Sequence, residues 1–224
     1  MLRRMIFPLL LGLVGGAVLV SLGVWQLQRL AWKEGILAQI EARIAADPLP
    51  VPDAPQVGDD QYLPVRVSGQ FTGEGLDVLV SRKQIGAGYR VIAVMEADGR
   101  RLLVDRGFLP VDQRGVARPE GQARVTGNLL WPDEVDSYTP APDARTGIWF
   151  ARDLPAMAAA LGTEPVLVVA RSVTPADAAV EPLPVDTSGI PNDHLGYAIQ
   201  WFGLALVWVG MTAFLLWRIR RRAE

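Results

Sequence analysis

Hydrophobic residues gather in two long runs at opposite ends of the chain, residues 6–27 and 195–217. Neither run contains Asp, Glu, Lys or Arg, whereas the roughly 165 residues between them mix polar and apolar positions as water-soluble domains do. The runs are 22 and 23 residues long. At about 1.5 Å per residue each forms roughly 33 Å of helix, enough to cross a hydrocarbon core of about 30 Å. The pattern predicts two transmembrane helices that flank a separate domain.

Between the two runs, the spacing of apolar residues first continues as a helix through Ile44, until Asp47-Pro48 supplies a stop. Period-two alternation then predicts short strands at residues 63–71, 76–80, 89–95, 101–105, 124–129 and 166–170. Asp98-Gly99 predicts a hairpin turn between two of them. The middle of the chain is therefore predicted to be a β-rich α+β domain with a helical stalk.

One short helix and two irregular stretches complete this domain. Asp153 is a candidate N-cap, the Ala-rich segment 156–161 follows it, and Gly162 is a candidate stop. The Pro-rich stretches 132–147 and 174–191 are expected to be irregular, and the second leads back to the membrane as an acidic, extended strap.

Basic residues lie between each apolar run and the nearer end of the chain. They are Arg3, Arg4, Arg218, Arg220, Arg221 and Arg222. Short Arg-rich flanks stay in the cytoplasm, so we expect both termini to be cytoplasmic and the net acidic middle domain to be extracytoplasmic.

The start of the chain has a rival interpretation as a secretory signal peptide. Such a peptide has an apolar core of about 7–15 residues before its cleavage site, whereas this run continues through Trp25 to Leu27. We therefore expect an uncleaved anchor. Because no Arg-rich and Ser-rich leader precedes it, we expect a bacterial inner membrane and a periplasmic domain.

The composition of the chain limits the kinds of site and partner that we expect. The chain has no cysteine, which excludes disulfides, thiolate ligands and a cysteine nucleophile. Its basic residues are scattered through a net acidic domain, so we expect no nucleic acid partner. A carboxylate-based hydrolase stays open as an alternative, since Asp105 and Glu134 are among several available acids, but their spacing resembles that of solvated loop and strand-end residues.

The second apolar run has two unlike faces. The only histidine of the chain, His194, begins a seven-residue series with Trp201 and Trp208, and Tyr197 lies close beside it. Glycines at 196, 203 and 210 form a second series about 200° around the helix. Since small residues let helices approach closely, we expect this glycine face to pack against glycines 12, 16 and 23 of the first run. The His194 face would then be turned towards lipid, a cofactor or a partner helix.

His194 has two interpretations. It can cap the helix as an interfacial polar residue, or it can supply an axial imidazole to haem iron, for which the porphyrin provides the other four nitrogens. One histidine without cysteine cannot build a tetrahedral zinc site. At the same depth, Arg29 and Lys33 lie on one stripe with Gln26. They either extend towards lipid headgroups or receive anionic groups such as haem propionates.

Five segments of the chain together resemble the Surfeit locus protein 1 family. They are residues 23–33, 62–71, 103–110, 149–154 and 191–202. The two terminal segments are the specific ones, above all Asn-x-His-Leu-x-Tyr-Ala-x-x-Trp at residues 192–201. The resemblance covers nearly the whole chain in order.

The resemblance implies an assembly factor for haem-copper cytochrome c oxidase that is not an enzyme. It implies binding or presentation of haem a, with His194 as the axial ligand, during insertion into the catalytic core subunit. The expected cofactor-binding residues are His194, Tyr197, Trp201, Arg29 and Lys33. The expected partners are the core subunit, haem a synthase and membrane lipid. The alternative is a haem-independent membrane scaffold that stabilises the apo core subunit.

The predicted organisation has three parts. Residues 1–28 form the cytoplasmic tail and first transmembrane helix, 29–193 the periplasmic domain with its stalk, and 194–224 the second transmembrane helix and basic cytoplasmic tail. The predicted fold class is therefore two transmembrane helices that flank a β-rich α+β extracytoplasmic domain.

Overall fold

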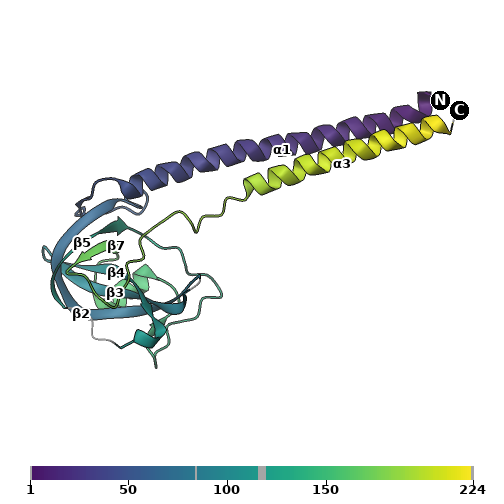
Figure 1. Cartoon of the computed structure of the whole chain (residues 1–224). Coiled ribbons are helices and arrows are strands. Elements are labelled where there is room, and N and C mark those ends of the chain that lie inside the picture. Colours follow the sequence, from purple (N-terminus) through teal and green to yellow (C-terminus); the bar gives the residue numbers. More distant parts are fainter. Residues whose placement is uncertain (1, 84, 116–119, 223–224) are drawn as a thin grey trace. The chain divides into compact units, whose positions relative to one another are not determined.

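The computed structural model describes residues 2–83, 85–115 and 120–222 (Figure 1). The side chains of Arg3 and Arg4, on which the predicted orientation partly depends, lie outside the described part. Contacts divide the chain into two units, one formed by Met1–Gln39 with Thr187–Glu224 and the other by Ile40–Asp186.

The helices and strands follow in this order: α1 (Leu2–Ala45), β1 (Leu49–Pro50), β2 (Pro64–Arg82), β3 (Gly86–Ala97), β4 (Arg100–Pro110), the 3-10 helix η1 (Val111–Gln113), β5 (Gly121–Leu129), β6 (Ile148–Trp149), α2 (Leu154–Leu161), β7 (Leu167–Thr174) and α3 (His194–Arg221).

The two long helices α1 and α3 are both apolar enough to cross a membrane. Most of their large hydrophobic side chains are exposed, among them Leu13, Val18, Leu206 and Met211. An apolar surface of this extent needs a non-aqueous surrounding. Two membrane helices that flank a β-rich domain are therefore the observed fold class, as the sequence predicted.

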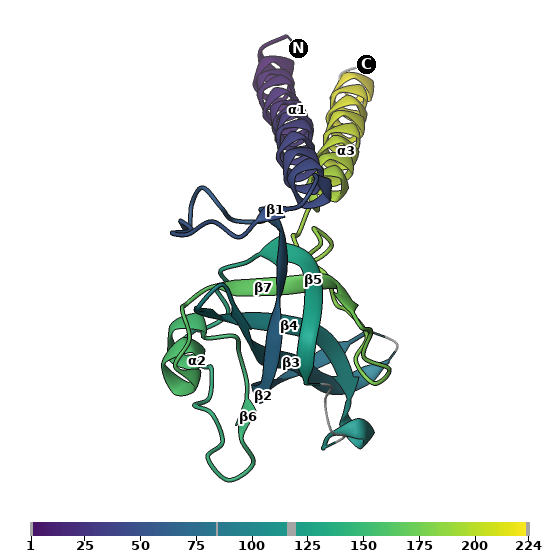
Figure 2. The same ribbon diagram turned by 90° about the vertical axis from the view of Figure 1, so that its left-hand side faces the viewer.

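The unit Ile40–Asp186 is built around a closed sheet (Figure 2). In the described residues, β2, β3 and β4 form a meander, β5 returns to pair with β2, and β7 closes the gap between β5 and β4. The order β5-β2-β3-β4 is a Greek key, and closure makes it a five-stranded Greek-key barrel, the architecture of OB-folds. Only the β4–β7 pairing within this barrel is parallel.

Strand β2 closes the barrel because it pairs with two neighbours along its length. Its first part, through Phe71, pairs with β5, and its second part pairs with β3. The register shifts between Phe71 and Gly75, where Gly73 has a φ of +83°. A Cβ at Gly69 or Gly75 would collide with carbonyl oxygens of β3. The predicted strands 63–71 and 76–80 are thus one strand that bends at its glycines.

Alternating side chains of the barrel strands fill two apolar layers. The interior layer draws residues from all five barrel strands, including Val65, Met95, Val104, Val125 and Val168. The outer layer lies under α2, where Leu154 and Met157 pack on the opposite side chains of β3, β4 and β7. Strands β3, β4 and β7 are therefore buried on both faces, which explains their nearly continuous apolar runs.

Local signals for α2 and for the β3–β4 turn are confirmed. The Asp153 carboxylate accepts a hydrogen bond from the Ala156 N–H at 3.1 Å, and Gly162 ends the helix with a φ of +61°. Asp98 and Gly99 both have positive φ, at 52° and 75°, as the favoured two-residue hairpin turn requires.

Candidate functional site

Helices α1 and α3 run antiparallel and side by side in one unit (Figure 1). Many of their buried and half-buried positions follow each other in steps of four and three residues, which is coiled-coil spacing. On α1 this series includes 12, 16, 19, 23, 26 and 30, and on α3 it includes 194, 198, 201, 205, 208 and 212. Half-buried residues such as Gly15, Leu22 and Phe202 lie beside the series. The His194 face of α3 is therefore the face that packs against α1.

The expectation that the glycine face of α3 packs against α1 is wrong. A Cβ built at Gly196, Gly203 or Gly210 would meet no atom of the described residues within 4 Å. The glycines of α1 instead receive large side chains of α3, because a Cβ at Gly15 would lie 2.5 Å from the Trp208 ring and one at Gly23 would lie 2.7 Å from Phe202. Rings on one helix fill the spaces that glycines leave on the other.

Trp208 is fixed by more than packing. Its indole Nε1–H donates a hydrogen bond to the Gly12 carbonyl oxygen at 3.1 Å. Inside an apolar layer an unpaired indole N–H would be costly. A tryptophan near the middle of a membrane helix is thus explained by the carbonyl partner at Gly12 and by the space that the missing side chain of Gly15 leaves for the ring.

His194 is the first residue of α3 and contacts α1 rather than capping its own helix. Its Nδ1 lies 2.9 Å from the Oε1 atom of Gln26. Gln26 is only 9% exposed and occupies the position one step beyond Gly23 in the α1 series. No other hydrogen bond of the imidazole is found among the described residues, so its Nε2 atom has no partner in that part of the chain. Nearby, Asn192 Oδ1 is buried without a hydrogen-bond partner in the same part of the chain.

The other predicted cofactor-binding residues lie on neighbouring turns of the same two helices. Tyr197 is 52% exposed, whereas Trp201 is half-buried against α1. The guanidinium of Arg29 lies 3.7 Å from the centroid of the Trp32 ring, a cation–π contact, and Lys33 is half-buried. The structure thus joins His194 to Gln26 and leaves Tyr197 and Arg29 accessible on the surface of their helices.

Sequence reasoning gave Gln26 no role of its own. The available signal was its position, since it is an amide at the end of an apolar run and at the packing spacing of the α1 glycines. What the sequence could not provide was the partner, because Gln26 and His194 are 168 residues apart.

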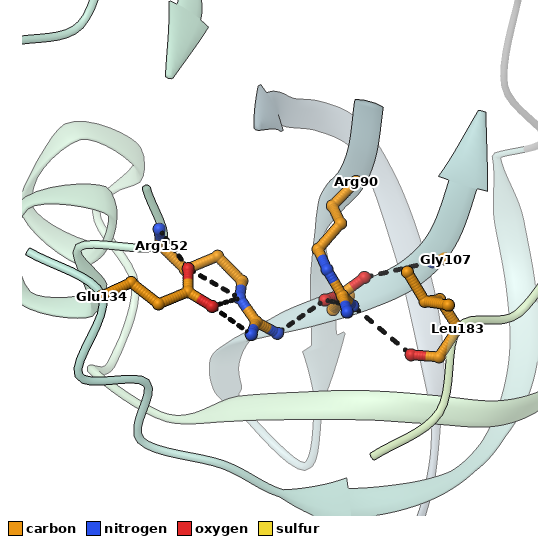
Figure 3. A network of polar contacts seen from close by, with 6 residues as sticks. Arg90, Gly107, Glu134, Arg152 and Leu183 are labelled. Atoms are coloured by element: carbon orange, nitrogen blue, oxygen red, sulfur yellow. Dashed lines mark hydrogen bonds and ion pairs between the residues drawn. The ribbon is translucent and has the colours of Figure 1, made fainter. Parts of the chain in front are cut away.

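The barrel contains a second polar cluster, which includes Arg90, Gly107, Glu134 and Arg152 (Figure 3). Its centre is Asp105, which is fully buried. Its Oδ2 accepts hydrogen bonds from Arg90 at 2.7 Å and from Arg152 at 3.2 Å, and its Oδ1 accepts one from the Gly107 N–H at 3.1 Å. Arg152 also forms a fork with Glu134. Burial raises the pKa of Asp105, and the charges of Arg90 and Arg152 oppose that rise.

This cluster also holds the acidic strap on the barrel. Arg90 donates to the Leu183 carbonyl oxygen at 3.3 Å, and Phe108 and Glu181 exchange two backbone hydrogen bonds of 2.7 and 2.9 Å. Gly107 sits in a bulge of β4 with a φ of +124°, and a Cβ there would collide with the Glu181 carbonyl oxygen. The bulge at Gly107 thus lets the strap cross β4.

The arrangement bears on the hydrolase alternative. Both oxygens of Asp105 and both oxygens of Glu134 are engaged by arginines or backbone N–H groups. Other acids of the domain, such as Asp98, Asp112, Asp133 and Asp136, are exposed. A carboxylate held in this way is a structural ion pair rather than a free general base.

Comparison with known proteins decides the family. The model of the SURF1 family matches residues 13–206. The chain belongs to the SURF1 family. The match confirms the resemblance, and it spans the barrel, Gln26 and His194 alike.

SURF1-family relatives come from animals and bacteria. The chain is 28% identical to Surfeit locus protein 1 of Rattus norvegicus over 187 residues, which cover 71% of this chain and 60% of the rat protein. It is 30% identical to the Homo sapiens protein of that name over 174 residues, covering 66% and 57%. It is 29% identical to the SURF1-like protein of Rickettsia felis over 150 residues, covering 63% and 65%. The chain thus spans about 60% of the length of the rat and human relatives.

Proposed function

We propose that this membrane protein is an assembly factor for haem-copper cytochrome c oxidase, and that it binds haem a through His194 and presents it to the catalytic core subunit. Membership of the SURF1 family supports the assembly role. The observation that carries the haem step is the hydrogen bond of His194 Nδ1 to Gln26 Oε1, because it engages one ring nitrogen and leaves the other for a ligand.

The donor set of this region fits a haem. An axial imidazole completes the iron coordination that the four porphyrin nitrogens begin, and the chain offers one histidine and no cysteine, so a competing tetrahedral metal site cannot form from them. Tyr197 is an exposed aromatic surface one helical turn from His194. Trp201, one further turn along, extends this apolar stripe, which suits a farnesyl tail.

Cationic side chains at the same level suit the propionate groups. Arg29 and Lys33 follow Gln26 by one and two turns of α1. Arg29 is exposed, with its guanidinium 3.7 Å from the centroid of the Trp32 ring, and planar pairing of guanidinium with carboxylate is strong.

The proposed setting is the inner membrane of a bacterium, with both termini cytoplasmic and the barrel in the periplasm. Arg218, Arg220 and Arg221 in the last turn of α3 support this orientation. The proposed partners are the oxidase core subunit, haem a synthase and membrane lipid, with no nucleic acid. The proposed role is non-enzymatic, since presentation of haem needs no bond of the porphyrin to break.

The test compares optical spectra of the full chain, purified in detergent with a histidine-free affinity tag from cells that also make haem a. We expect haem a absorption bands in the wild type and their loss in His194→Ala. Gln200→Ala is the matched control, because Gln200 is an exposed polar residue of the same helix, and it should keep the bands.

A well-folded wild type without haem, from membranes that contain haem a, would overturn the haem step. It would favour the second candidate, a haem-independent scaffold that holds the apo core subunit. The observation behind that candidate is the exposed glycine face of α3, at Gly196, Gly203 and Gly210. In that case Gly203→Leu, and not His194→Ala, would abolish oxidase assembly.

A further inference from the structure

We propose that Gln26 is a positioning residue that sets the tautomer of His194 and thereby makes Nε2 the ligand atom. The inference rests on the proposed function only for the identity of the ligand. The tautomer itself is a property of the chain without haem.

The hydrogen bond fixes where the imidazole carries its proton. With the Gln26 carboxamide oriented as in the structure, its oxygen faces Nδ1 at 2.9 Å. A carboxamide oxygen has no hydrogen and can only accept, so we infer that Nδ1 donates. A neutral imidazole has a single N–H, and its other nitrogen then holds a lone pair. With Nδ1 protonated, that lone pair is on Nε2, the nitrogen that makes no hydrogen bond among the described residues.

Without Gln26 the preference would reverse. In free histidine the Nε2–H tautomer predominates, and a protonated Nε2 cannot bind a metal ion. Histidines that ligate metals commonly donate their other N–H to a carboxylate, a carbonyl or water, which orients the ring and raises its basicity. Gln26 supplies a neutral oxygen for this purpose. A neutral acceptor raises the ligand basicity less than a carboxylate would, which suits a protein that must release its cargo.

The hydrogen bond also depends on the pairing of the two helices. Gln26 is buried on α1 and His194 begins α3, and the second cross-helix hydrogen bond joins Trp208 to Gly12. The two bonds are separated by 14 residues on each helix, which is two heptads. The ligand atom is therefore presented only when α1 and α3 pack in this register.

The chain is well suited to a direct test, because it has a single imidazole to observe. The full chain is labelled with ¹⁵N-histidine, purified with a histidine-free tag in detergent, and studied without haem at about pH 8.5, roughly two units above the reference value of free histidine. Long-range ¹H–¹⁵N correlation spectra separate the Nδ1–H from the Nε2–H tautomer. We expect Nδ1–H in the wild type and in Gln26→Glu, and a shift to Nε2–H in Gln26→Leu.

Gln28→Leu is the matched control, since Gln28 is an exposed glutamine two residues along the same helix. It should leave the tautomer unchanged. A wild type that holds the Nε2–H tautomer, or a Gln26→Leu variant that keeps Nδ1–H, would overturn the inference whether or not the protein binds haem.

The ligand step is tested by titration with ferric protoporphyrin IX, followed through its Soret band. Loss of an oriented hydrogen bond to a ligating histidine typically lowers metal affinity by about 10–100-fold, and we expect a loss in this range for Gln26→Leu. Gln26→Glu should bind more tightly and release more slowly, while Gln28→Leu should match the wild type. Equal affinity in Gln26→Leu and wild type, with binding lost in His194→Ala, would overturn the positioning role. Absence of binding in every variant would instead contradict the proposed function.

Discussion

Buried polar groups are more fully paired in the barrel than between the two membrane helices. In the barrel, Asp105 is surrounded by two arginines and a backbone N–H, and Arg152 is shared with Glu134. Between the helices, Gln26 and His194 share one hydrogen bond, between Oε1 and Nδ1. The other imidazole nitrogen, Nε2, makes no hydrogen bond among the described residues. The barrel cluster is closed to further ligands, whereas the helix cluster is open to one.

The difference follows from charge. A buried carboxylate or guanidinium must be paired and hydrogen-bonded, because an uncompensated charge in a low-dielectric interior is very costly. Burial of an uncharged amide or imidazole carries a smaller desolvation penalty. A donor or acceptor atom of such a group can therefore stay without a hydrogen-bond partner at a lower cost in free energy. Binding of a transient ligand is therefore easier to accommodate between the helices than at Asp105.

The largest expected effect is at Asp105. Asp105→Asn removes the negative charge between Arg90 and Arg152 and should lower the free energy of unfolding by about 3–5 kcal/mol, as for other broken buried ion pairs. The measurement is chemical denaturation of the full chain in detergent, followed by near-ultraviolet circular dichroism. Asp112→Asn is the control, because Asp112 is exposed and should change stability by no more than about 0.5 kcal/mol. Wild-type stability in Asp105→Asn would remove the contrast between the two regions.

An intermediate effect is expected where α1 and α3 meet. Gly15→Leu would force a side chain into the Trp208 ring, and overpacking of this kind costs about 1–3 kcal/mol. The chain has no cysteine of its own, so Gly16→Cys with Val209→Cys provides a clean disulfide reporter. A Cβ at Gly16 would lie 3.7 Å from Val209 Cγ2.

We expect Gly15→Leu to lower the disulfide yield several-fold in membranes, and Gly210→Leu to leave it unchanged because nothing lies near Gly210. The opposite result, with Gly210→Leu disrupting the pair and Gly15→Leu tolerated, would mean that the glycine face of α3 contacts α1 after all.

The smallest expected effect concerns an ion pair at the barrel surface. Hydrogen bonding from Arg100 lowers the pKa of Glu164 below its ordinary value of about 4.3. A carboxyl with a lowered pKa stabilises the fold above the unfolded-state pKa and loses that contribution as pH falls through the folded-state pKa. Glu164→Gln should therefore flatten the decline of barrel stability below about pH 4.3, by at most about 0.5 kcal/mol for so exposed a pair.

The measurement is the denaturation midpoint at neutral pH and at about pH 3.5, above and below the ordinary glutamate pKa of about 4.3. Glu120→Gln is the matched control, since it is an exposed glutamate of the same unit. An unchanged acid dependence in Glu164→Gln would show that the pair with Arg100 is fully screened by solvent.

Local signals in the sequence determined the elements that form from neighbouring residues. The two apolar helices, the Asp153 cap with its Gly162 stop, the Asp98-Gly99 turn and most strand positions were all predicted, because each depends on backbone and side-chain preferences within a few residues. The motif at residues 192–201 indicated the family and identified His194 as a candidate ligand. It did not indicate that Gln26 is the hydrogen-bond partner of His194.

The tertiary structure alone decided which distant surfaces meet. The glycines of α3 and of α1 have similar spacing in the sequence, but only those of α1 contact aromatic rings of the other helix. Small residues permit close approach, but they do not determine which residues of another helix pack against them. The pairing of β2 with both β3 and β5, and the hydrogen bond from His194 to Gln26, likewise join residues far apart in the chain. Such contacts depend on how complete elements pack, and no short stretch of sequence encodes that.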